Sequence, residues 1–159
     1  MNTEKKIISV NEKIPSGLFQ KLKESMGTKY DNPRFLILFF YPKDDTPGCT
    51  QEAKDFRDLY TDFKNLNCEI IGISRDTIKS HENFSCKYQL SFPLYSDQTE
   101  ELCHLFDVIR PKNLYGKLVR GIERSTFIID SNQNLIQEWR KVKVEGHAEA
   151  VLQVIKNME

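Results

Sequence analysis

The apolar segment at residues 34–41 (RFLILFFY) constrains the fold more than any other part of the sequence. Its residues from Phe35 to Tyr41 are all apolar, which is typical of a strand whose two faces are both covered. The segment is far shorter than the roughly 20 residues that a membrane-spanning helix needs. It therefore predicts a central strand in a sheet that carries helices on both sides.

A long helix is expected after this strand, because apolar residues recur there at spacings of three and four. They are Ala53, Phe56, Tyr60, Phe63 and Leu66. The remaining pattern predicts strands at 69–74 and 92–95, helices at 77–89 and 99–106, a hairpin of 125–130 with 135–139, and a closing helix after Gly146. Strands that alternate with helices and end in a hairpin predict one α/β domain over residues 1–159. We expect a thioredoxin-like sandwich with a mixed central sheet.

Two segments have weaker patterns. Residues 1–33 are polar, and Leu18, Phe19 and Leu22 are expected to pack as a short strand or turn. Residues 109–121 (IRPKNLYGKLVRG) are basic and contain proline and glycine, so a loop is expected.

The charges exclude a strong attraction to polyanions. The 23 basic and 23 acidic residues cancel, so no overall field favours nucleic acid or an anionic membrane. Trp139 lies beside basic residues, but few aromatic residues are interleaved with them, which favours a solvated basic surface over a nucleic-acid site.

The first ten residues lack the apolar stretch of a secretory signal. We expect a cytoplasmic protein with no nucleic-acid or membrane partner.

The chain has four cysteines, Cys49, Cys68, Cys86 and Cys103. In a reducing compartment they are expected to be thiols. None forms a C-x-x-C pair, which argues against a zinc site, and no metal or cofactor is expected. Cys68 and Cys103 lie in apolar surroundings and are expected to be core residues. His81, His104 and His147 are expected to have surface or capping roles.

Cys49 is the strongest candidate for chemistry, since it follows Thr46, Pro47 and Gly48 between a buried strand and a helix. Thr46 is typical of a helix N-cap and Pro47 of the first helical position. Unpaired N–H groups and the helix dipole would then favour a thiolate at Cys49, and the thiolate is the nucleophile. Gly48 would let a substrate approach the backbone. The alternative is that Cys49 is simply a small buried apolar residue.

The segment PKDDTPGCT resembles the signature of the peroxiredoxins, with Pro42, Thr46 and Cys49 at its characteristic spacing. SRDTIKSHENF, FPLYSD, FDVI and WRKVKVEGHAEAVL are similar to the bacterioferritin-comigratory, or Q-type, branch. The resemblance implies that Cys49 attacks a hydroperoxide and becomes a sulfenic acid, with Pro42 shielding the sulfur and Thr46 holding both reactants. ERSTFIID implies that Arg124 stabilises the thiolate. Glu52 would orient Arg124, or would be an ordinary acidic residue in the first turn of a helix.

The resemblance also bears on how the sulfenic acid is removed. Some Q-type members use a cysteine five residues after the first, where this chain has Lys54. Others use a cysteine directly after an Asn-Phe pair, where this chain has Ser85, with Cys86 one residue later. In the family this route needs local unfolding, which would tolerate the shift. The resemblance thus implies a monomeric peroxidase resolved by Cys86 and recycled by thioredoxin.

Two alternatives stay open. In one, the chain is a one-cysteine peroxidase that an external thiol such as glutathione, with or without glutaredoxin, reduces. In the other, it is a non-enzymatic peroxide sensor or chaperone-like module.

Overall fold

A mixed five-stranded sheet forms the centre of the protein in the computed structural model, which describes residues 7–27 and 32–158. The strand order is β3-β2-β1-β6-β7. β1 pairs with β2 in parallel and with β6 in antiparallel orientation, and β7 pairs antiparallel with β6. These strands are β1 (Phe35–Phe40), β2 (Cys68–Ser74), β3 (Leu94–Ser96), β6 (Ser125–Asp130) and β7 (Leu135–Trp139). The predicted α/β, thioredoxin-like sandwich is confirmed.

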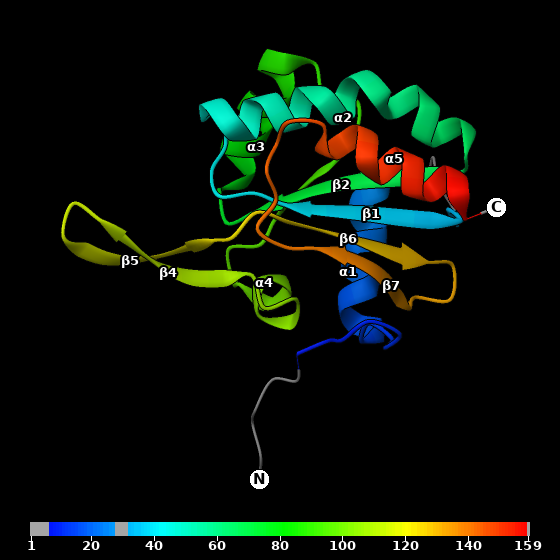
Figure 1. Cartoon of the computed structure of the whole chain (residues 1–159), viewed down its shortest axis with the longest axis horizontal. Coiled ribbons are helices and arrows are strands. Elements are labelled where there is room, and N and C mark those ends of the chain that lie inside the picture. Colours follow the sequence, from blue (N-terminus) through cyan, green and yellow to red (C-terminus); the bar gives the residue numbers. More distant parts are fainter. Residues whose placement is uncertain (1–6, 28–31, 159) are drawn as a thin grey trace, which may run out of the picture.

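Helices cover both faces of this sheet (Figure 1). On one face lie α2 (Pro47–Asn65), α3 (Ile78–Tyr88) and α5 (His147–Asn157), and on the other lie α1 (Ser16–Met26) and α4 (Glu101–Leu105). Each predicted helix and strand of the sandwich is present, with ends displaced by one or two residues where they differ. Within the described residues, no helix combines the length and the apolar character needed to cross a membrane.

β1 contributes side chains to both apolar cores. Phe35, Ile37 and Phe39 pack on the side of α2 and α5. Leu36, Leu38 and Phe40 pack on the opposite side. All six residues of the strand are buried. The prediction of a strand covered on both faces is therefore confirmed, and its end is held rigidly by the two layers.

The prediction of a loop at residues 109–121 is wrong. The segment forms a separate hairpin of β4 (Ile109–Leu114) and β5 (Lys117–Ile122), which projects from the sandwich (Figure 1). Tyr115 and Gly116 form its turn with φ of 52° and 79°, as a two-residue hairpin turn requires. Pro111 and the long exposed side chains obscured the strand pattern, since proline is rare inside a sheet.

The expectation of a strand or turn around Leu18, Phe19 and Leu22 is also wrong, because these residues lie in helix α1. Leu22 and Met26 are its buried residues and are four positions apart, as one face of a helix requires. The polar residues between them made the period hard to recognise in the sequence.

Candidate active site

The loop from β1 to α2 places Cys49 in the first turn of a helix. Thr46 occupies the N-cap position with extended dihedrals (φ −97°, ψ 155°), and Pro47 begins the helix. The N–H of Thr50 donates to the Thr46 carbonyl over 2.8 Å. The amides of Gly48 and Cys49 therefore belong to the helix start, where N–H groups have no intrahelical acceptor.

The hydroxyl of Thr46 does not cap α2. It donates to the carbonyl oxygen of Lys43 over 2.8 Å, back along the loop. Thr46 thus holds the N-cap position as predicted, while its side chain fixes the loop that precedes Cys49. Its oxygen keeps lone pairs that can accept a hydrogen bond from a ligand. Pro42 lies two residues beyond β1 and is partly exposed.

Arg124 reaches Cys49 because of the strand register. Phe40 at the end of β1 pairs with Ser125 at the start of β6, so the residue before β6 lies beside the loop that carries Cys49. Nη2 of Arg124 donates to the Cys49 sulfur over 3.5 Å, and its Nη1 donates to Oε1 of Glu52 over 2.7 Å. Arg124 thus contacts both Cys49 and Glu52, and all three residues were site candidates in the sequence analysis.

Burial strengthens the electrostatic interactions among Cys49, Arg124 and Glu52. Cys49 and Glu52 are each only 1% exposed. Burial raises the pKa of Glu52 to about 7, although Arg124 opposes this shift. Burial alone would lower the pKa of Arg124, but Glu52 and Cys49 raise it. The guanidinium therefore stays charged between the sulfur and the carboxyl group.

Cys68 and Cys103, which the sequence predicted to be core residues, are buried, and their thiols have surroundings different from those of Cys49. Burial raises the pKa of Cys68 to about 12 and raises that of Cys103 as well. Thiols of this kind react slowly because the thiolate is disfavoured. Cys86 is exposed on α3 and lines a hollow of about 460 Å³ beside Phe92 and Pro93.

The expectation of surface or capping roles for the histidines is wrong for two of the three. His81 and His147 are buried, whereas His104 is exposed and lies 3.4 Å from Glu100. Nε2 of His147 lies 2.7 Å from the Thr126 hydroxyl. Burial, and then the charge of Arg124, lower the pKa of His147 to about 4. A neutral ring therefore lies behind Arg124.

No local pattern in the sequence indicated these buried histidines. Their partners are distant in the chain, 21 residues away for His147 and 37 for His81, which faces Asp44. The one signal for their burial was that each histidine lies in the first turn of a helix that has an apolar face.

Comparison with known proteins decides the family. A model of the AhpC/TSA family matches residues 13–138. The chain belongs to the AhpC/TSA family. Within this family it falls in the Bcp/Q branch of the peroxiredoxins. It is 54% identical over 122 residues to Peroxiredoxin Bcp of Xanthomonas campestris pv. campestris, covering 77% of this chain and 76% of that protein. It is 49% identical over 125 residues to Peroxiredoxin Bcp of Bacillus subtilis, covering 79% and 80%.

Solved structures of peroxiredoxins agree with this placement. The bacterioferritin comigratory protein of Xanthomonas campestris superposes with a TM-score of 0.76 at 52% identity, covering 80% of this chain and 81% of that one. A cysteine mutant of Xylella fastidiosa PrxQ gives 0.84 at 36% identity, covering 95% and 97%. This peroxiredoxin is therefore an enzyme, a thiol peroxidase that uses a peroxide and a thiol reductant. The non-enzymatic alternative is not supported.

Proposed function

We propose that Cys49 is the residue that attacks the peroxide and that the substrates are hydrogen peroxide and organic hydroperoxides. The contact of Arg124 with the Cys49 sulfur at the start of α2 carries this proposal. The thiolate attacks the terminal oxygen of ROOH, the O–O bond breaks, and the departing oxygen takes a proton to leave as ROH. Sulfur loses two electrons and becomes a sulfenic acid.

The surrounding groups suit this reaction. Arg124 would stabilise the thiolate and the negative charge that develops on the peroxide oxygens. The amides of Gly48 and Cys49 would supply fixed donors at the same place. Thr46 would accept a hydrogen bond from the hydroperoxide, since its own hydrogen is engaged with Lys43. Glu52 would orient Arg124, and Pro42 would shield the sulfur from water.

Peroxide entry requires some movement, because Cys49 is 1% exposed. The side chain of Arg124 is 15% exposed and lies over the sulfur. A small displacement of such side chains would admit a peroxide, which is a narrow molecule.

We further propose that Cys86 resolves the sulfenic acid. Its thiol would attack the Cys49 sulfur, form a disulfide and release water, and thioredoxin would then reduce the disulfide to two thiols. A disulfide requires Cα atoms within about 7 Å. Because Cys86 is exposed on a folded helix, α3 must open for the bond to form. Solved Xanthomonas campestris Peroxiredoxin Q structures include serine mutants of two cysteines, which fits a two-cysteine cycle in that relative.

One observation favours a second candidate, the one-cysteine peroxidase recycled by glutathione. Ser85 stands where the resemblance places the resolving cysteine, and Cys86 is turned to solvent. An external thiol would then attack the sulfenic acid instead. In either case we propose a cytoplasmic monomer that uses no metal or cofactor.

An NADPH-coupled assay with thioredoxin and its reductase tests the proposal. Wild type should turn over hydrogen peroxide and an alkyl hydroperoxide, and Cys49→Ser should abolish turnover. Cys86→Ser should abolish the rate supported by thioredoxin while leaving one equivalent of peroxide consumed. Turnover that survives in Cys86→Ser, or that glutathione alone supports in wild type, would favour the second candidate.

Cys68→Ser is the matched control for these variants. The Cys68 sulfur lies 3.6 Å from the Leu66 carbonyl, and a hydroxyl can donate to the same oxygen. This variant should keep the wild-type rate, which would show that loss of a thiol alone does not reduce activity.

A further inference from the structure

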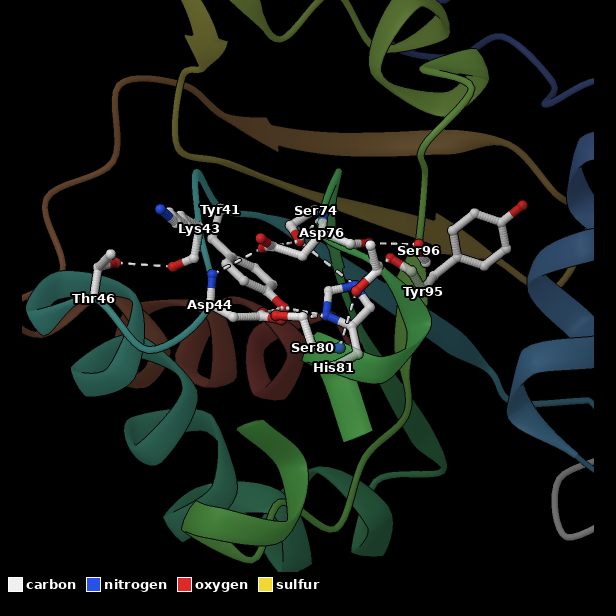
Figure 2. A network of polar contacts seen from close by, with 11 residues as sticks. Tyr41, Lys43, Asp44, Thr46, Ser74, Asp76, Ser80, His81, Tyr95 and Ser96 are labelled. Atoms are coloured by element: carbon white, nitrogen blue, oxygen red, sulfur yellow. Dashed lines mark hydrogen bonds and ion pairs between the residues drawn. The ribbon is translucent and has the colours of Figure 1, made fainter. Parts of the chain in front are cut away.

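A buried polar network lies behind the loop that joins β1 to α2, and the peroxidase reaction described above does not use it (Figure 2). Asp44 is at its centre. The Tyr41 hydroxyl donates to Asp44 Oδ1 over 2.6 Å, and the Ser80 hydroxyl donates to Oδ2 over 2.8 Å. Nδ1 of His81 lies 2.8 Å from the same Oδ2. The side chains of Asp44 and His81 are only 3% and 5% exposed.

This network joins the two elements that carry the reactive cysteines. Asp44 belongs to the loop that leads through Thr46 to Cys49. Ser80 and His81 belong to the first turn of α3, the helix on which Cys86 lies. The Asp44–His81 pair therefore holds α3 against the active-site loop. In the proposed cycle, α3 is also the helix that must open for a Cys49–Cys86 disulfide to form.

A second set of contacts links the same loop to the other end of α3. Lys87 Nζ and the Tyr88 hydroxyl donate to the carboxylate of Asp45 over 2.8 and 2.7 Å. These groups are exposed to solvent, where ion pairs contribute little to stability. The contacts on either side of Cys86 thus differ in burial, since the Asp44–His81 contact is shielded from solvent and the Asp45–Lys87 ion pair is not.

His81 connects Asp44 to a neighbouring part of the chain. Nδ1 of His81 faces the Asp44 carboxylate, and its Nε2 lies 3.1 Å from the carbonyl oxygen of Tyr95. The Ser74 hydroxyl lies 3.5 Å from the same Nε2. Burial would raise the pKa of Asp44, but bonds from His81, Tyr41 and Ser80 hold it below its ordinary value. Burial, and then Asp44, keep the pKa of Tyr41 high, so its phenol remains a donor.

Asp76, the second carboxyl group of the network, also accepts hydrogen bonds from protein donors. Oδ2 of Asp76 accepts from the Asp44 amide over 2.8 Å and from the Ser74 hydroxyl over 2.7 Å. Facing atoms of Asp44, Asp76 and His81 lie within 4.8 Å of one another, a spacing that a cation would also accept. Since the donors of the chain already occupy these oxygens, hydrogen bonding accounts for the cluster.

We propose that Asp44 and His81 form a latch that positions α3 against the active-site loop and sets how readily α3 opens after Cys49 is oxidised. The consequence for catalysis rests on the proposed role of Cys86. Opening α3 takes the His81 ring and the Ser80 hydroxyl away from the Asp44 carboxylate, and a buried carboxylate that loses its hydrogen-bond partners is strongly unfavourable. The latch therefore keeps α3 closed during attack on the peroxide and limits the rate of the resolving step.

Hydrogen exchange of the α3 amides in the reduced protein tests the latch without any catalytic step. His81→Gln keeps one donor and should raise exchange in residues 78–88 about tenfold, and Ser80→Ala about threefold. Ser85→Ala is the matched control, because its hydroxyl donates over 3.5 Å to the carbonyl oxygen of Leu90, which follows α3, and not to Asp44. It should change exchange less than about twofold. Unchanged exchange in Ser80→Ala would overturn the latch, even where His81→Gln does not fold.

Two further measurements separate a latch from general destabilisation. Exchange in α2 and α5 should stay at the wild-type value, and an equal rise there would overturn the proposal. Rapid-quench mass spectrometry should show unchanged sulfenic acid formation but faster disulfide formation, in the order His81→Gln, Ser80→Ala, wild type. Slowing of both steps together would count against it.

A different result would reject the resolving role of Cys86 without rejecting the latch. If α3 exchange rises as expected and no Cys49–Cys86 disulfide forms in any variant or in wild type, the latch is supported and Cys86 is rejected as the resolving residue.

Discussion

Gly48 provides the space that the Arg124 guanidinium occupies. A Cβ atom at residue 48 would lie 3.1 Å from Nη2 of Arg124, the atom that contacts the Cys49 sulfur. That distance is tighter than nearly all Cβ contacts, so the guanidinium would have to shift. The glycine, expected from the sequence to let a substrate approach, therefore makes room for the side chain of Arg124, the residue that precedes β6.

Gly48→Ala should consequently slow the reaction of Cys49 with peroxide by about tenfold, the effect of weakening one charged donor in a buried site. Stopped-flow kinetics under single-turnover conditions would measure it. Gly17→Ala is the control, because a Cβ there has no atom within 4 Å and should not change the rate. An unchanged rate in Gly48→Ala would show that Arg124 does not need its present position.

Glu52 should make the protein less stable as the pH rises through neutrality. Its pKa is raised from 4.5 to about 7 by burial, so the folded state binds the proton more tightly than the unfolded state. The stabilisation from this proton is fully present below about pH 4.5 and is lost as pH rises through about 7. Glu52→Gln should remove this slope, worth about 3 kcal/mol. Urea unfolding between pH 4.5 and 8 would measure it, and parallel curves for the two proteins would contradict it.

His147 should have the opposite effect. Its pKa is lowered from 6.5 to about 4, so its contribution is present above pH 6.5 and is lost as pH falls through about 4. His147→Gln keeps a donor toward Thr126 but cannot take up a proton. Its free energy of unfolding should fall less than that of wild type from pH 7 to 4, by up to about 3 kcal/mol. Because Glu52 acts in the opposite sense over nearly the same range, the two contributions should largely cancel in wild type. The two single variants should therefore slope in opposite directions, and the double variant should have a profile close to that of wild type.

The position of the resolving thiol should matter little if α3 is open when the disulfide forms. Ser85→Cys combined with Cys86→Ser moves the thiol by one residue, which is about 100° around a folded helix. In an opened segment, loop closure hardly depends on one residue, so disulfide formation should change by less than about threefold. Mass spectrometry after one equivalent of peroxide would follow it. A change of tenfold or more would show that α3 remains helical during the step.

The sequence predicted the parts of the site that depend on local order. A buried strand, a proline at a helix start and a cysteine in the first turn are neighbours in the chain, and the structure places Cys49 accordingly. Arg124 was indicated only by family resemblance, because its approach to Cys49 depends on the pairing of β1 with β6. Thr46 holds the N-cap position that the sequence predicted, but the contact of its hydroxyl with Lys43 could not be predicted, since the loop conformation sets it.

Long-range contacts explain most of what the sequence did not predict. Helix α1 depends on a face of the sheet to bury Leu22 and Met26, and the β4–β5 hairpin depends on its turn. The burial of His81 and His147 depends on partners in other elements, so both residues were assigned to the surface. Apart from the hairpin, whose turn is local, these errors came from tertiary contacts that no local period records.

The order of the strands has a consequence for synthesis of the protein. Cys49 precedes Arg124 by 75 residues, and the two meet only when β6 inserts beside β1. While the chain is still being made, the Cys49 sulfur emerges before Arg124, the residue proposed to activate it. On that proposal, full reactivity would be withheld until β6 has paired with β1, which would spare an unfinished chain premature oxidation at this sulfur.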